Sequence, residues 1–141
     1  MFSPTRDQAR RFFVEAWNKQ NRGLPLTQLE RLAAGIVALH PEYHALLERG
    51  DEALAREWTP EGGETNPFLH LSLHLAVEEQ LAIDQPPGVT ALFASLLLSR
   101  ADRHAALHEV LECLGETVWQ AQRNAAPPDA AAYLDCVRRR L

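Results

Sequence analysis

The sequence predicts an all-α protein, a single domain built as a bundle of about six to seven helices. No segment shows the alternation of apolar and polar residues that marks a half-buried strand, and β-branched residues are scarce. Helix start and stop signals, in contrast, recur along the whole chain. The chain has 141 residues, of which 46% are hydrophobic, and this is enough to bury a core without a structural metal. We therefore expect residues 1–141 to form one all-α domain.

The first helix is predicted over residues 3–21. Ser3 followed by Pro4 is typical of a helix N-cap and its first position. Gly23 and Pro25 then end the helix, because glycine favours left-handed backbone geometry and proline cannot continue the hydrogen-bond ladder.

The second helix begins at a capping box formed by Thr27 and Glu30 and carries apolar residues at helical spacing. Pro41 then interrupts it, since a proline disfavours helical geometry in the residue before it. The helix either kinks at His40 or restarts with Pro41 in its first turn. A short helix over residues 51–58 follows.

Residues 59–66 form the clearest loop in the chain, because they combine glycine, proline and polar residues. The segments after it begin with strong caps. Asn66 stands before a proline, Asp102 opens a long amphipathic stretch, and Asp129 follows two prolines. These caps predict helices over about 66–84, 102–124 and 129–141. The strongly apolar residues after the break at 85–88 predict a fourth helix over about 90–99.

All six histidines fall in three His-x-x-x-His pairs, and a glutamate follows each pair four residues later. Residues i and i+4 lie on one helix face, with Cβ atoms about 6 Å apart, so two rings can converge on one metal ion. The glutamate can bind the ion or orient a ligand from outside. We expect the three pairs to meet in one interior pocket. The predicted metal ligands are His40, His44, His70, His74, Glu78, His104, His108 and Glu112, and the sequence leaves open whether Glu48 or Tyr43 joins them.

Six imidazoles and several carboxylates are too many for one ion and suit two. Imidazole accommodates zinc, iron, copper and nickel, whereas carboxylates favour iron or manganese. Two-metal sites in helical bundles combine histidines and glutamates from facing helices. The predicted cofactor is therefore a pair of non-haem iron ions, with zinc, manganese and copper left open. The predicted function is a metal-binding protein with redox or oxygen-linked chemistry, a metal-dependent oxidoreductase acting on dioxygen or a small molecule.

Three other functions are compatible with the same residues. The histidines can be structural or pH-sensing groups in a non-enzymatic helical interaction module. Zinc with an activated water would give a hydrolase. Helix N-termini can also bind anions, although the glutamates on these faces would repel an anion.

Composition excludes several classes of partner and indicates a location. A net charge of −5 and a pI near 5.6 argue against nucleic-acid binding, which needs a basic surface. The longest apolar run, residues 91–98, is far shorter than the roughly 20 residues of a membrane span.

The N-terminus lacks the apolar region of a secretory signal, so we expect a cytoplasmic protein. Cys113 and Cys136 are then expected to be free thiols buried in helices. The sequence also allows a homo-oligomer.

Four motifs resemble a known family. They are HPEYH at 40–44, NPFLHLSLH at 66–74, DQPPGV at 84–89 and CLGETVWQAQR at 113–123. Together they are similar to a family of small bacterial proteins described as a domain of unknown function. The resemblance extends from residues 12–17 to the C-terminal helix, and the histidine pairs fit the family pattern. It implies no particular reaction.

Overall fold

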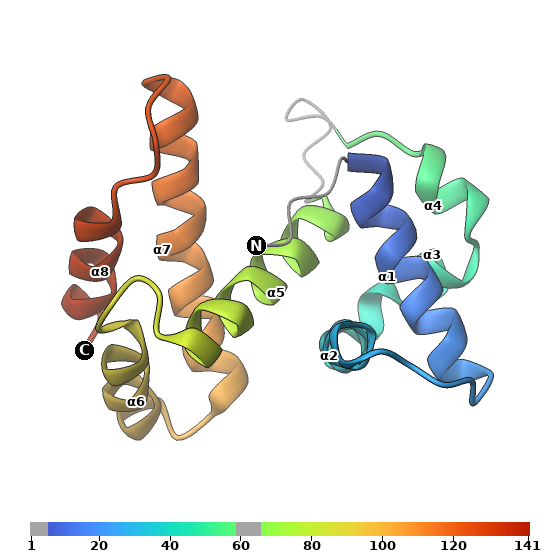
Figure 1. Ribbon diagram of the computed structural model, residues 1–141, viewed down its shortest axis with the longest axis horizontal. Coiled ribbons are helices and arrows are strands. Elements are labelled where there is room, and N and C mark those ends of the chain that lie inside the picture. The colour runs from blue at the N-terminus through green and yellow to red at the C-terminus, as the bar shows by residue number, and fades with distance from the viewer. Residues whose placement is uncertain (1–5, 59–65) are drawn as a thin grey trace. The chain divides into compact units, whose positions relative to one another are not determined.

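The computed structural model describes residues 6–58 and 66–141 (Figure 1). Within these residues the chain forms eight α-helices and one 3-10 helix, and no strand. The all-α prediction is therefore confirmed, with slightly more helices than the six to seven expected. The elements are α1 Arg6–Asn21, α2 Gln28–Ala38, η1 Pro41–Tyr43, α3 His44–Glu48, α4 Asp51–Ala55, α5 Pro67–Ile83, α6 Val89–Arg100, α7 Arg103–Arg123 and α8 Ala130–Arg139.

The additional α-helix is α3: the segment that restarts at Pro41 forms η1 and then this five-residue helix, whereas α4 corresponds to the short helix predicted over residues 51–58. The expected start at Ser3 and residues 59–65 of the loop expected over 59–66 lie outside the described residues. None of the described helices combines the length and the apolar composition that a membrane crossing requires.

The chain divides into two compact units, and the boundary falls within α5, after Leu75. We call them the N-terminal unit, up to Leu75, and the C-terminal unit, from Ala76. Each is built around buried apolar residues of its own, so the prediction of one domain over residues 1–141 stays a prediction.

In the N-terminal unit, α1 packs against α2, α3 and α4. The first half of α5 adds Phe68, Leu71 and Leu75 to the same core, because spacings of three and four residues place these side chains on one face of the helix. The core consists of Phe13, Ala16, Trp17, Ala33, Ile36, Val37, Leu47, Ala53, Phe68, Leu71 and Leu75.

Arg10 and Glu30 are charged side chains buried in this unit. Arg10 is 2% exposed, and its Nη1 donates to the carbonyl oxygens of Leu54 at 3.2 Å and Arg56 at 2.6 Å. Its guanidinium also lies over the rings of Trp58 and Phe68, at 5.1 and 5.2 Å. A buried charge is tolerated when it is hydrogen-bonded, and the last carbonyls of a helix favour a cation. Arg10 thus holds the end of α4 against α1.

The capping box at the start of α2 is confirmed. The backbone N–H of Glu30 donates to Thr27 Oγ1 at 3.1 Å, and the backbone N–H of Thr27 donates to Glu30 Oε1 at 2.9 Å. Lys19 Nζ adds an ion pair to Glu30 Oε2 at 2.7 Å. The start of α2 is therefore fixed by its own first turn and by one side chain from α1.

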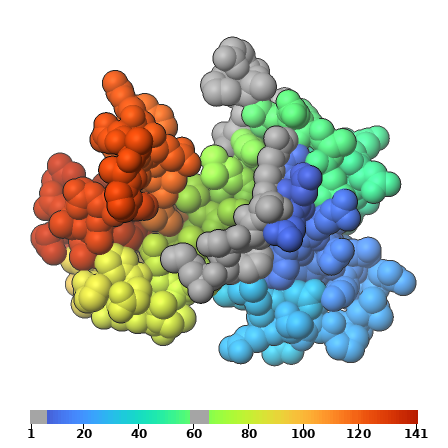
Figure 2. Space-filling model, turned by 45° about the horizontal axis from the view of Figure 1, so that its top comes forward, coloured from blue at the N-terminus to red at the C-terminus, as the bar shows by residue number. Residues whose placement is uncertain are grey.

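In the C-terminal unit, α6, α7 and α8 pack against one another. Figure 2 shows α7 and α8, in orange and red, side by side. Tyr133 of α8 donates its hydroxyl hydrogen to Gln80 Oε1, in the second half of α5, at 2.6 Å. The predicted caps Asp102 and Asp129 are both present, accepting from the backbone N–H of His104 and Ala132. The larger buried side chains are Val77, Val89, Phe93, Leu96, Leu107, Val110, Leu111, Leu114, Tyr133 and Val137.

The expectation of free thiols is wrong. Cys113 of α7 and Cys136 of α8 form a disulfide, with Cα atoms 5.7 Å apart. The expectation relied on the cytoplasmic environment and could not include the packing of α8 on α7. That packing brings the two Cα atoms into the 4.4–6.8 Å range that a disulfide requires.

Replacing Thr27 by alanine is expected to lower the free energy of unfolding by about 1 kcal/mol, because the N–H of Glu30 loses its acceptor. Urea denaturation followed by circular dichroism measures the change. Thr27→Ser keeps the hydroxyl and is the control. Equal unfolding midpoints for the alanine and serine variants would show that the capping box does not stabilise α2.

The ionisation of Glu30 is expected to stabilise the fold in a pH-dependent way. The hydrogen bond from Lys19, followed by that from the backbone of Thr27, holds the pKa of Glu30 below its ordinary value. A carboxyl group whose pKa is lowered by folding stabilises the protein above its unfolded pKa. This stability is lost as the pH falls through the folded pKa.

The difference in unfolding free energy between the wild-type protein and Glu30→Gln should therefore shrink as the pH falls from about 6 to about 3. Urea titrations at a series of pH values measure it. A difference that stays constant over this range contradicts the role given to the carboxylate.

Candidate metal centre

His40 lies between α2 and η1, and Pro41 determines its conformation. The backbone of His40 has φ −125° and ψ 69°, so α2 ends at Ala38 and the chain restarts with Pro41 at the first position of η1. Of the two outcomes that the sequence left open, the restart is the one observed. The ring is 2% exposed, and its Nδ1 lies 2.8 Å from the carbonyl oxygen of Ile36. Because a carbonyl only accepts, Nδ1 carries the proton and neutral His40 presents a lone pair at Nε2.

His70 and His74 lie one turn apart on α5 and share a face, as the spacing predicts. Asn66 accepts the backbone N–H of Phe68 at 3.0 Å and so caps the helix that carries them. The Nε2 atom of His70 lies 3.1 Å from Nε2 of His40 and 3.2 Å from Nε2 of His74.

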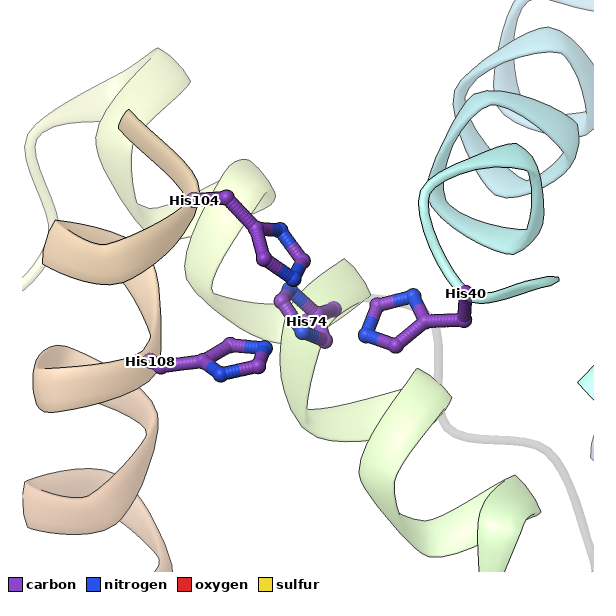
Figure 3. Close-up of side chains that lie close together, drawn as sticks. All are labelled: His40, His74, His104 and His108. Atoms are coloured by element: carbon purple, nitrogen blue, oxygen red, sulfur yellow. The ribbon is translucent and has the colours of Figure 1, made fainter. Parts of the chain in front are cut away.

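Figure 3 shows the ring of His40 directed toward that of His74, and ligand nitrogens of these two lie within 4.8 Å. We call His40, His70 and His74 the histidine trio. All three belong to the N-terminal unit.

Two ordinary hydrogen bonds do not account for both contacts of His70 Nε2. If this nitrogen is protonated, it can donate linearly to only one of its two neighbours. If it is not, its lone pair faces the lone pair of His40. A metal cation would satisfy all three nitrogens at once. Ligand nitrogens 2.0–2.1 Å from a tetrahedral ion are about 3.3 Å apart, close to the two observed separations.

Tyr43 lies against the trio through its ring. It stacks nearly parallel to His40, with ring centroids 5.5 Å apart and planes 7° apart, and its centroid is 6.2 Å from that of His70. Burial, followed by the negative charge of Glu42, raises the pKa of Tyr43, so its hydroxyl is neutral at physiological pH. Tyr43 thus forms an aromatic wall beside His40. Glu48, the other residue left open, is exposed.

His44 takes a different position from the one its spacing suggests. Its Nε2 donates to the carbonyl oxygen of Val37 at 2.8 Å, and its ring lies on Trp17 with centroids 4.4 Å apart. The i,i+4 rule does not apply here, because η1 lies between His40 and His44 and the two are not on one continuous α-helix. The structure therefore brings His40 to His70 and His74, and places His44 against α1 and α2.

The third pair, His104 and His108, lies in the first turns of α7 in the C-terminal unit. Their ring centroids are 4.1 Å apart, and ligand nitrogens of the two lie within 4.8 Å. Both rings project from the same side of α7 (Figure 3). The pair thus has the geometry that the spacing predicts, whereas the convergence of all three pairs in one pocket stays a prediction.

The two predicted carboxylate ligands pair with arginines. Glu78 Oε1 lies 2.8 Å from Nη2 of Arg103, and Glu112 Oε2 lies 2.5 Å from Nη1 of Arg140. Glu112 is exposed on α7. Their role as metal ligands stays a prediction.

The fold and the trio define an all-α protein with a histidine cluster compatible with metal binding. The model of one protein family matches residues 5–139, and the chain belongs to this family, which is described as "Domain of unknown function (DUF1841)". The resemblance noted in the sequence is thereby confirmed. A search of curated proteins and a search of solved structures gave no match.

Proposed function

We propose that this protein binds a transition-metal ion through the Nε2 atoms of the histidine trio. The observation that carries the proposal is the position of His70 Nε2, at 3.1 and 3.2 Å from two other imidazole nitrogens. A second feature supports it: His40 donates its other ring N–H to a backbone carbonyl, as metal-binding histidines commonly do. This bond fixes both the tautomer and the direction of the ring.

The proposal extends to the identity of the metal ion and to the chemistry that it would support. Three imidazole nitrogens suit zinc, copper or iron. Iron is our first choice, because the sequence places glutamates beside the histidine pairs, and it would supply one-electron chemistry. The trio would bind and orient the ion, and the ring of Tyr43 would screen His40 from water. In this form the protein is a cytoplasmic oxidoreductase whose partner is dioxygen or a small molecule.

Replacing His70 by alanine is expected to weaken metal binding by at least about 100-fold, since it removes the central ligand of the trio. The measurement is elemental analysis of protein made without a polyhistidine tag, followed by competition with a chelator of known affinity. His44→Phe is the matched control, because it keeps a ring on Trp17 and removes an imidazole outside the trio.

Equal affinities for the His70 and His44 variants contradict the proposal. A wild-type protein that takes up neither iron, zinc, manganese nor copper at micromolar metal concentration contradicts it as well. The histidines would then be structural or pH-sensing groups.

We propose in addition that His104 and His108 bind a second iron ion, as the prediction of a two-iron site requires. It is supported by the short distance between these rings and by the repeated spacing. Two equivalents of iron per chain are then expected in the wild-type protein and at most one in His108→Ala. Elemental analysis gives the count, and Mössbauer spectroscopy tells a coupled pair from two separate ions. An unchanged metal content in His108→Ala would rule out this second site.

A further inference from the structure

A cleft of about 580 Å³ lies in the C-terminal unit, between the second half of α7 and α8, which lines it from its N-cap to its last residue. Its volume is within the range of small-molecule sites, roughly 300–1,000 Å³. Both disulfide cysteines line it, together with side chains of either charge. The residues that matter here are Cys113, Cys136, Glu116 and Arg139.

We propose that this cleft binds a low-molecular-weight thiol with amino-acid end groups, which exchanges with the disulfide at Cys136. Arg139 offers a guanidinium to the carboxylate of such a molecule, and Glu116 offers a carboxylate to its ammonium group. Arg139 pairs with Asp135 at 3.5 Å, but both side chains are more than half exposed. Exposed pairs of this kind are weak, so Arg139 can turn toward a bound ligand.

The burial of the two cysteines determines which sulfur reacts. Cys113 is 0% exposed, whereas Cys136 is half-buried and can be reached from the cleft. The thiolate of the small molecule attacks Cys136 Sγ and forms a new disulfide with it. The Cys113–Cys136 bond breaks, and Cys113 leaves as a thiolate that takes a proton from water.

In the reverse direction, the Cys113 thiolate attacks Cys136 Sγ and releases the small thiol. The exchange needs no other oxidant or reductant. It does not involve the histidine trio, which lies in the other unit.

Two single-cysteine variants test the choice of sulfur. Each is treated with glutathione disulfide, and the mixed disulfide is followed by intact-protein mass spectrometry. Cys113→Ser, which keeps Cys136, is expected to react at least about ten-fold faster than Cys136→Ser, because a buried cysteine is inert. Equal rates would overturn the proposal.

A second pair of variants, in the Cys113→Ser background, tests whether Arg139 recognises the carboxylate of the small molecule. Arg139→Gln is expected to slow the reaction with glutathione disulfide about three- to five-fold and to leave that with uncharged bis(2-hydroxyethyl) disulfide unchanged. Arg138→Gln is the matched control, since Arg138 also pairs with Asp135 and is not among the residues that line the cleft. The proposed binding site would be overturned if the two arginine variants slowed the reaction with glutathione disulfide equally. It would also be overturned if Arg139→Gln slowed the reactions with both disulfides to the same extent.

The same arginine comparison can be made with the disulfide intact, which guards against single-cysteine variants that do not fold. Opening of the wild-type disulfide by glutathione should be slower in Arg139→Gln than in Arg138→Gln. Opening by 2-mercaptoethanol should be equal in the two. Any other pattern contradicts the proposal.

Discussion

The restriction that Pro41 places on His40 is the constraint on which the candidate site depends. Because Pro41 disfavours helical geometry at His40, α2 ends at Ala38, and the carbonyls of Ile36 and Val37 accept the backbone N–H groups of Leu39 and His40, three residues further on. Two histidine side chains add a second hydrogen bond to each carbonyl: Nδ1 of His40 donates to Ile36, and Nε2 of His44 donates to Val37. The end of α2 and the orientation of the His40 ring therefore have a common cause, and that orientation leaves Nε2 of His40 to meet His70.

The same constraint gives the two histidines of HPEYH different roles. The 3-10 turn between them directs His40 to α5 and His44 to Trp17, a residue of the core of the N-terminal unit. His44 thereby ties the turn that carries His40 to a part of the protein that is closely packed. A ligand set must be held within a fraction of an ångström to bind an ion well, and a turn anchored on the core meets this need better than a free one.

The parts of the structure that the sequence predicted are those set by neighbouring residues. The caps at Thr27, Asn66, Asp102 and Asp129 each act within three residues of themselves, and His70 and His74 share a helix turn. What the sequence missed depends on packing between distant segments: the disulfide and the pairing of Glu78 with Arg103. The position of His44 was missed for another reason, because the i,i+4 rule was applied across a proline that breaks the helix.

The number of ligands that the trio supplies bears directly on its chemistry. If the trio binds an ion, three neutral imidazoles would leave the full charge of the ion in place, and a four-coordinate ion would need a fourth ligand from outside the trio. Structural zinc sites are closed by four protein ligands, whereas catalytic ones keep a position for water or substrate. A fourth ligand from solvent would place an acidic water or an oxygen ligand beside the ring of Tyr43, in a cluster of which His40 and His74 are buried. A fourth ligand from a side chain would instead make the ion a cross-link between α5 and the turn before η1. The identity of that ligand, rather than of the metal alone, thus separates a reactive centre from a structural one.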